Sequence, residues 1–270
     1  ATVAPMSVPA TAPPRVGALL RDWRTRRRLS QLDLSLEAGV SARHLSFVET
    51  GRSRPSPEMV LHLAEHLDVP LRERNGLLLA AGYAPVYGQR GLDDPEMEPA
   101  REAIDTILRG HEPYPAIVLD RHWGIVAANA AVAVIVEGVA PELLEPPVNV
   151  LRATLHPDGL APRIVNLAQL RAHVLETVRR QALAGGDPAL DTLLAELESY
   201  PAPDEPVHAP FGEIAVPMRL RRGDEVLSFI TAVATFGTAT DVTLAELSIE
   251  TMFPVDEATA ARMRALVPAS

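Results

Sequence analysis

The sequence predicts two domains of different fold class: an N-terminal all-α domain of five helices, and a C-terminal α+β domain built on an antiparallel sheet. Its 270 residues are enough for two ordinary domains, and a hydrophobic share of 47% is enough to form their cores. Apolar residues recur at helical spacing as far as residue 85, whereas short runs typical of strands begin only after residue 115. We expect a flexible tail over 1–14, the helical domain over 15–85, a linker over 86–96 and the second domain over 97–270.

Apolar stripes predict the first and the fourth of the five helices. The first helix carries Val16, Leu19, Leu20 and Trp23, which recur at i, i+3, i+4 and i+7 and so share one face. A similar stripe over residues 59–67 predicts the fourth helix. The fifth is expected over 71–81, where Gly82 ends it.

The second and third helices have the spacing of a helix-turn-helix. Ser30 is expected to cap a helix over 31–38, and Asp33 completes a weak capping box three residues later. Gly39 suits the left-handed turn that follows, the small residue Ser35 suits the close approach of the two helices, and Ser41 begins a third helix that runs to about residue 50. Leu45 and Val48 are spaced to face the core. The outward side, which would face a DNA major groove, then holds Ser41, Ala42, Arg43, Ser46 and Phe47.

The charge of the chain is unevenly distributed. The formal net charge is -10, all 25 basic residues are arginine, and no cysteine is present. Residues 1–85 carry 11 arginines against 8 acids, a balance of +3, whereas residues 86–270 carry 14 against 27, or -13. Within residues 15–54 the balance is 9 against 4, or +5. Positive charge is therefore local to the predicted helix-turn-helix, and the acidic remainder would discourage DNA from binding elsewhere.

Residues 29–82 resemble the phage-repressor-like helix-turn-helix regulators, the XRE family. The likeness is carried by "LS…L…AGVS…LS.VE.GRSRPS" and by the closing "LLLAAGYAP". It implies double-stranded operator DNA as a partner, with Gln31, Arg52 and Arg54 at phosphate-contacting positions and Ser41, Ala42, Arg43 and Ser46 at base-facing ones. The same likeness makes Glu49 a structural acid that holds the fold.

Two alternatives stay open for the arginines. Arg28 at the end of the first helix is a further candidate for DNA contact, but the arginines of that helix, Arg21 and Arg24 above all, also fit a solvated face. Arg43 could equally be an ordinary surface residue.

The second domain shows a mixed pattern. Helices are expected over 97–108, 167–183 and 187–198, in the Ala-rich run after Asn129, and from the cap Asp256 to Leu266. Strands are expected over 116–120 and 124–129, in a hairpin that turns at Gly223, and through "LAELSIETMFPV" with alternating Leu247, Ile249, Thr251 and Phe253. We expect the helices to cover one face of the antiparallel sheet.

This domain resembles the PAS-like sensor fold and, more narrowly, the ligand-binding domain of the MmyB-like transcription regulators. The likeness covers about residues 100–265 through "LDRHWGIVAANAA", "NVLRATLHPDGLAPRIVNLAQLRAHVL" and "VATFGTATDVTLAELSIETMFPVDEATAARMR". It implies a transcriptional regulator with a sensor pocket for a small, apolar, fatty-acid-like effector.

Polar residues of the second domain give the candidate ligand contacts: Trp123, Asn129, His156, Arg163, Asn166 and His173. The alternative is structural, since "HPDGLAPRIVN" is rich in turn residues whose side chains satisfy loop backbone. Neither His156 nor His173 has the spacing of a metal ligand pair, and no nucleophile elbow or phosphate loop is present. A carboxylate pair for acid–base chemistry stays open, but we expect no metal, no cofactor and no enzyme activity.

The sequence therefore predicts a DNA-binding regulator that senses a small molecule and acts as a homodimer, because one helix in one half-site gives limited affinity. The main alternative is a protein-interaction module tethered to DNA, with no small-molecule ligand. A DNA-binding enzyme ranks below both. We expect a cytoplasmic chain, because no apolar run reaches the length of a signal peptide core or a membrane span.

Overall fold

The structure is a computed structural model that describes residues 15–201 and 215–267, and the chain divides into two compact units, Ala1–Gly88 and Gln89–Ser270. The tail expected over 1–14 lies outside the described residues. Each unit is described by itself.

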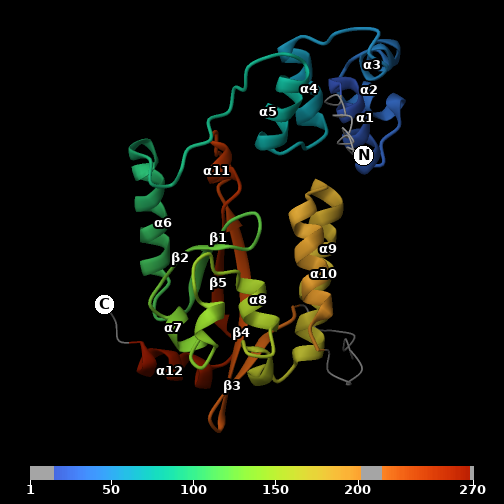
Figure 1. Ribbon diagram of the computed structural model, residues 1–270. Coiled ribbons are helices and arrows are strands. Elements are labelled where there is room, and N and C mark those ends of the chain that lie inside the picture. The colour runs from blue at the N-terminus through green and yellow to red at the C-terminus, as the bar shows by residue number, and fades with distance from the viewer. Residues whose placement is uncertain (1–14, 202–214, 268–270) are drawn as a thin grey trace, which may run out of the picture. The chain divides into compact units, whose positions relative to one another are not determined.

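The first unit contains the five helices that the sequence predicts (Figure 1). Ser30 Oγ accepts a hydrogen bond from Asp33 N (3.1 Å), and Asp33 Oδ2 accepts one from Ser30 N (2.8 Å), so the capping box is confirmed. Gly39 has a φ of +63°, which a side chain would disfavour and which lets the chain turn between the two helices. The helices are α1 (Val16–Arg26), α2 (Gln31–Glu37), α3 (Ala42–Glu49), α4 (Pro57–His66) and α5 (Leu71–Ala80).

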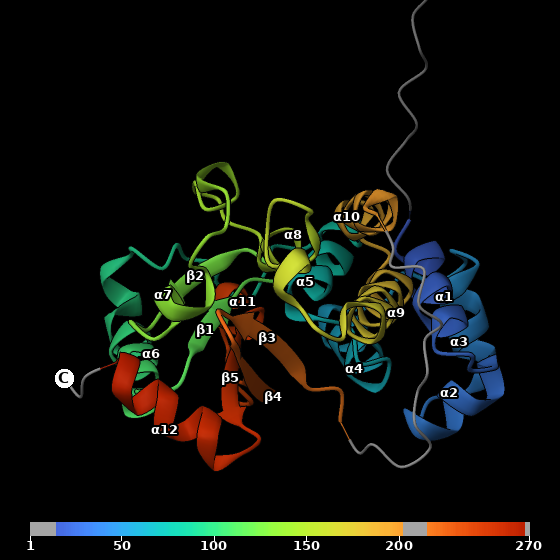
Figure 2. The ribbon, with the colours of Figure 1, turned by 90° about the horizontal axis from the view of Figure 1, so that it is seen from below.

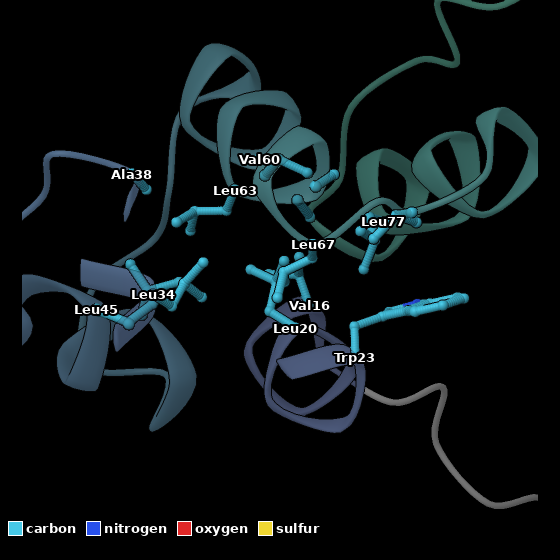
Figure 3. Close-up of a cluster of buried hydrophobic side chains, with 14 of the residues drawn as sticks. Val16, Leu20, Trp23, Leu34, Ala38, Leu45, Val60, Leu63, Leu67 and Leu77 are labelled. Carbon is cyan, nitrogen blue, oxygen red and sulfur yellow. The ribbon is translucent and has the colours of Figure 1, made fainter. Parts of the chain in front are cut away.

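One hydrophobic core joins these helices. Leu20 of α1, Leu34 of α2, Leu45 of α3, Leu63 of α4 and Leu77 of α5 converge, and each is at most 1% exposed (Figure 3). Burying such side chains contributes about 1.5–3 kcal/mol each. The apolar stripes that predicted the helices are the faces that meet here.

The start of α1 lies directly against the end of α3. A Cβ atom at Gly17 would sit 2.2 Å from the carbonyl oxygen of Val48 and 2.8 Å from that of Glu49. Such distances are far below van der Waals contact, so only glycine allows α1 this close to the α3 backbone. The position of α3 is therefore fixed through its backbone as well as through Leu45 and Val48.

The second unit is an α+β domain with a five-stranded antiparallel sheet in the order β2-β1-β5-β4-β3. The central strands β1 and β5 thus come from opposite ends of the segment, as a PAS-like fold predicts. Its elements are η1 (Pro95–Met97), α6 (Glu98–Gly110), β1 (Ala116–Leu119), β2 (Ile125–Ala128), α7 (Val132–Ile135), η2 (Pro141–Leu143), α8 (Val150–Leu155), η3 (Ala161–Arg163), α9 (Leu167–Gly185), α10 (Pro188–Ser199), β3 (Met218–Arg222), β4 (Glu225–Thr235), α11 (Val242–Ala245), β5 (Ser248–Pro254) and α12 (Glu257–Leu266).

The helices cover both faces of this sheet at its centre, contrary to the expectation of one covered face. Ile104 and Leu108 of α6 pack with Val118 of β1 and Ile249 of β5 on one face. Ile117, which precedes Val118 on β1, points to the other face, on the side of α7 and α8. Figure 2 shows α6 and α8 on opposite sides of β1 and β5. Alternating residues of β1 are buried in both directions, which explains why all four of its residues are buried.

Strand β4 extends beyond its neighbour. Its residues Glu225–Phe229 pair with β3, but Ile230–Thr235 pair only with β5, and all six of these residues are exposed. Within the described part of the chain, no strand pairs with the other edge of this stretch.

Several helix and strand ends differ from the sequence expectation. The strand expected through "LAELSIETMFPV" begins later, at Ser248, because the first residues of that stretch belong to the short helix α11. Asp241 caps this helix, since its Oδ1 accepts a hydrogen bond from Thr243 N (2.9 Å). The Ala-rich run after Asn129 is helical only over α7. Helix α8 was not expected, and its cap is Asn149, whose Oδ1 accepts from Leu151 N and Arg152 N (3.1 and 3.2 Å).

Candidate DNA interface and apolar cavity

The outward side of α3 is the candidate DNA interface. Ser41 Oγ accepts a hydrogen bond from His44 N (3.1 Å) and fixes the N-terminus of α3, the end that a helix-turn-helix presents to base edges. Ser41 and Arg43 are exposed, and Ala42, Ser46 and Phe47 are partly exposed. The buried residues Leu45 and Val48 hold the opposite side of the helix in the core.

Two guanidinium groups lie near the Phe47 ring. The Cζ atoms of Arg43 and Arg52 lie 5.4 Å and 5.9 Å from the ring centroid, within the range of cation–π attraction. Two cations that the sequence assigned to different tasks, base reading and phosphate contact, are thus brought to one aromatic side chain. Attraction to the same ring favours a position of both cations on one side of the domain, at about 0.5–1 kcal/mol for each exposed contact.

A buried carboxylate ties three helices together behind this surface. Glu49 Oε1 accepts from Arg24 Nε (2.7 Å), and Glu49 Oε2 accepts from Arg24 Nη2 (2.9 Å) and from Gln31 Nε2 (2.7 Å). Burial alone would raise the pKa of Glu49, but the hydrogen bonds from Arg24 and Gln31, together with the charges of Arg24 and Arg21, leave it below its usual value. Glu49 is 8% exposed, which agrees with a structural acid.

This cluster changes how two sequence expectations are to be understood. Arg24 does not belong to a solvated face, since its side chain is 12% exposed and also donates from Nη1 to Leu29 O (2.8 Å). Gln31, expected at a phosphate, uses its amide to bind Glu49. Its second amide hydrogen is not part of that bond, so phosphate contact by Gln31 stays a prediction.

The remaining two DNA candidates lie in the segments between helices. Arg54 donates from Nε and Nη2 to the carbonyl oxygen of Ala81 (3.2 and 2.8 Å), the residue that follows α5. Its Cζ lies 5.0 Å from the centroid of the Tyr83 ring, so the side chain caps the C-terminus of α5. Arg28 is exposed just after α1, with a φ of +57°. Contact of either residue with DNA stays a prediction.

A small apolar cavity lies in the second unit between the sheet and the helices α7 and α8. Its volume is about 50 Å³, and Thr154 is its only lining residue with a polar side chain among those that the structure describes. It is enclosed by β1, β2, β3, β5 and the loops around α7 and α8, through residues that include Ile117, Ile125, Ile135, Ala153, Leu160 and Met252. Such a cavity accepts apolar atoms and offers few hydrogen bonds.

None of the six residues expected to contact a ligand lines this cavity. Asn129 is buried and bonds only backbone: Nδ2 donates to Leu108 O (3.1 Å) and Tyr114 O (2.8 Å), and Oδ1 accepts from Ala116 N (3.1 Å). Asn166 joins η3 and α9 to the chain around β3: Nδ2 donates to Pro217 O (2.8 Å) and to Gln169 Oε1 (3.1 Å), and Oδ1 accepts from Arg219 N (3.2 Å).

The other four candidates also have structural partners or lie at the surface. Arg163 donates to the carbonyl oxygens of Arg221 (3.1 Å), Ile135 (3.2 Å) and Glu137. His156 Nδ1 accepts from Asp158 N (3.0 Å), and Trp123 Nε1 donates to Gln181 Oε1 (2.9 Å). His173 is exposed on α9. The geometry favours the structural alternative for His156, Arg163 and Asn166, and ligand contact by the six residues stays a prediction.

Sequence reasoning missed Glu250, a carboxyl group at the centre of the sheet. It lies on β5 directly opposite Ile117 of β1, and burial raises its pKa to about 7. An acid in the middle of the strand "LSIETMF" was the available signal, because central strands rarely place an unpaired charge on a covered face.

The described residues hold no group of three or more histidine, cysteine or acidic side chains able to bind a metal ion. Over the same residues, no helix combines the length and the apolar character needed to span a bilayer.

The comparisons with known proteins match both units. Residues 100–266 match the family model of the MmyB-like transcription regulator ligand binding domain, and residues 20–74 match a helix-turn-helix model, so both resemblances stated from the sequence are confirmed. No curated protein matches the chain. Among solved structures it is similar to "Structure of an RNA-binding Light-Oxygen-Voltage Receptor", at 13% identity and a TM-score of 0.26, over 93% of this chain and 63% of that one. The chain thus spans less than two thirds of that structure's length.

Proposed function

The chain belongs to the family defined by the MmyB-like transcription regulator ligand binding domain, and from this premise we propose a one-component regulator that binds operator DNA and a small apolar effector. The helix-turn-helix unit reads the operator, and the cavity of the second unit accepts the effector. Both matched models describe regulator domains, which supports a protein that binds rather than catalyses. A regulator of this kind works where the DNA is, so we place it in the cytoplasm.

The observation that carries the proposal is that the guanidinium groups of Arg43 and Arg52 both lie near the Phe47 ring. Arg43 lies on α3, where its guanidinium has the two parallel donors that match guanine O6 and N7. Arg52 follows α3 and suits a phosphate oxygen. One patch therefore combines a group that specifies a base with a group that positions the backbone.

The cavity supports an apolar effector but must open to hold one. Ligand sites commonly measure about 300–1,000 Å³, whereas this cavity has about 50 Å³. Binding would therefore separate α7 or α8 from the sheet, and that displacement is the change that could reach the DNA-binding unit. By linkage, the effector alters operator affinity only as far as it prefers one arrangement of the protein.

A homodimer completes the proposal. One recognition helix in one half-site gives limited affinity, and two half-sites about 34 Å apart fit a protein with two-fold symmetry. Native mass spectrometry of the purified chain measures its subunit number and any retained small molecule in one experiment. A monomer at operator-binding concentrations would contradict this part.

The effector proposal is tested by filling the cavity. Ala153 is 4% exposed and lines the cavity, so Ala153→Phe should occupy the effector's place while α3 is untouched. We expect the variant to bind operator DNA but to lose the change in affinity that a medium-chain alcohol causes in the wild type. Ala172→Phe, at an exposed position of α9 that does not line the cavity, is the control. If the wild type itself shows no change of operator affinity with any apolar compound, the effector function is refuted.

The second candidate is a protein-interaction module tethered to DNA, and the exposed stretch Ile230–Thr235 of β4 is the observation that favours it. A free strand edge pairs readily with an extended segment of another chain. A protein partner that co-purifies with the chain, with no retained small molecule in the native mass spectrum, would favour this candidate.

A further inference from the structure

The strand register places Glu250 beside the apolar cavity. Glu250 is the direct cross-strand partner of Ile117, and Met252 lies two residues further along β5 on the same face. Ile117 and Met252 both line the cavity. Glu250 is not itself among the lining residues, but directly opposed side chains in a sheet have Cβ atoms about 4.5–5.5 Å apart, so its side chain lies next to that of Ile117, which lines the cavity.

The other flank of Glu250 faces an open surface. Its partner on β4 is Val233, which is 61% exposed, and the neighbours on the same face, Thr231 and Thr235, are also exposed. Glu250 itself is only partly buried. The carboxyl group therefore lies between a closed apolar space on the β1 side and solvent on the β4 side.

Glu250 has no partner within the described residues. No hydrogen bond or ion pair joins its carboxyl group to another side chain or to the backbone there, and burial is the sole cause that perturbs it. Its neighbours on the same face of β1, β4 and β5 are all uncharged. Other partly buried acids of this unit are paired, as Glu196 is with Arg152 (2.7 Å) and Asp187 with Arg121 (3.4 Å). An unpaired acid in this place is costly to the fold unless a ligand satisfies it.

We propose that Glu250 is the polar anchor of the effector site, and that it selects an effector with an apolar chain and a protonated amine at its end. The apolar chain would occupy the space lined by Ile117 and Met252, and the ammonium group would meet the carboxylate at the β4 side. A ligand with a carboxylate head would place two negative charges together and be disfavoured. This inference rests on the proposed effector function, whose failure the experiment below separates from its own.

The test compares three probes of equal chain length: decylamine, decanol and decanoate, each below its micelle concentration. Binding to the full chain is measured by isothermal titration calorimetry for the wild type and for Glu250→Gln. The control is Glu145→Gln, which removes the same charge from an exposed position. Thermal unfolding of each variant establishes that it folds.

We expect decylamine to bind the wild type at least about tenfold more tightly than decanoate, and Glu250→Gln to lose about tenfold in decylamine affinity, or ~1.4 kcal/mol. Decanol affinity should change little, and Glu145→Gln should behave as the wild type. The anchor role of Glu250 is refuted if decanol binds the wild type but Glu250→Gln leaves the affinity for decylamine unchanged. It is also refuted if decanoate binds the wild type as tightly as decylamine does. In both cases the effector function itself still stands. If none of the three probes binds the wild type, both the anchor and the effector function are refuted.

Discussion

Arg24 and Glu49, 25 residues apart in sequence, join α1 to α3 through two parallel hydrogen bonds of 2.7 and 2.9 Å. The Glu49 side chain is only 2% exposed. Because the same carboxylate also accepts from Gln31 of α2, it fixes the recognition helix relative to both of its neighbours. The DNA-reading side of α3 depends on this bond at its back.

Removing Glu49 from its ion pair with Arg24 should destabilise the first unit strongly. Glu49→Ala leaves Arg24 without its buried counter-charge, and we expect a loss of about 3 kcal/mol in the free energy of unfolding. Urea unfolding, followed through Trp23 fluorescence in a Trp123→Phe background, measures this unit. Glu37→Ala, at an exposed position of α2, should change the free energy by less than about 0.5 kcal/mol. Equal effects of the two substitutions would contradict the structural role of Glu49.

The same bond predicts how the first unit responds to acid. The pKa of Glu49 is lowered in the folded protein, so its contribution is fully present above the unfolded pKa of about 4.5 and is lost as the pH falls through the folded value. The wild type should therefore lose stability below about pH 4.5 more steeply than Glu49→Gln. Urea titrations at pH 3 and pH 7 with the same fluorescence signal provide the comparison, and parallel pH profiles would exclude Glu49 as the cause.

Gly17→Ala should disrupt the contact of α1 with α3. The added Cβ would lie 2.2 Å from Val48 O, a backbone atom that cannot move aside alone, and we expect a loss of about 1–3 kcal/mol. Gly76→Ala is the matched control, since its Cβ would meet nothing nearer than 4.0 Å within α5. That substitution should stabilise by about 0.5–1 kcal/mol, because alanine favours helix. Thermal unfolding that ranks the two variants in the reverse order would contradict the close approach.

Arg43→Ala and Arg52→Ala should weaken DNA binding in different ways. Loss of the base-reading Arg43 should cost about 1–3 kcal/mol on the operator and relax one base position. Loss of Arg52 should weaken all sequences alike and reduce the salt slope by about one. Titrations of operator and scrambled DNA across salt concentrations separate the two roles, and equal, sequence-independent losses would refute base reading by Arg43.

Glu250→Gln should stabilise the second unit at high pH. The pKa of Glu250 is raised to about 7 in the folded protein, so the wild type keeps its full stability below the unfolded pKa of about 4.5 and loses it as the pH rises through 7. At pH 8.5 the variant should be more stable by roughly 2–3 kcal/mol. At pH 4.5 the two should be equal. Urea unfolding followed by circular dichroism at both pH values measures the difference, and a difference that does not depend on pH would contradict burial of the carboxyl group.

The local signals of the sequence predicted most of the fold. Ser30 with Asp33, Gly39 and Ser41 set the ends of α2 and α3 through interactions within a few residues, and such interactions can be read from spacing. Helix α8 was not predicted, because its cap, Asn149, precedes only six helical residues, too few to show an apolar stripe. The sequence also did not predict that helices cover both faces of the sheet, because the face on which α6 packs depends on contacts between residues distant in sequence.

In the candidate sites too, features set by local spacing could be predicted from the sequence, whereas contacts between distant residues could not. The outward residues of α3 follow from helical spacing, since Leu45 and Val48 fix which side is buried. The partners of Arg24 and Gln31 do not follow, because both meet Glu49 only after three helices pack. In the second unit, polar residues such as Asn129 and Asn166 stood out in the sequence but bind backbone. The sequence shows an acid within a predicted strand at Glu250, but its place beside the cavity follows only from the pairing of β1 with β5.

The free edge of β4 also affects how the protein behaves in concentrated solution. Ile230–Thr235 reads Ile-Thr-Ala-Val-Ala-Thr, a stretch with no charge and no proline, which are the residues that keep exposed strands from joining. We therefore expect copies of the chain to associate at this edge in concentrated solution. Ala232→Lys, on the face away from Glu250, places one charge within the stretch and should raise solubility while sparing the cavity and α3.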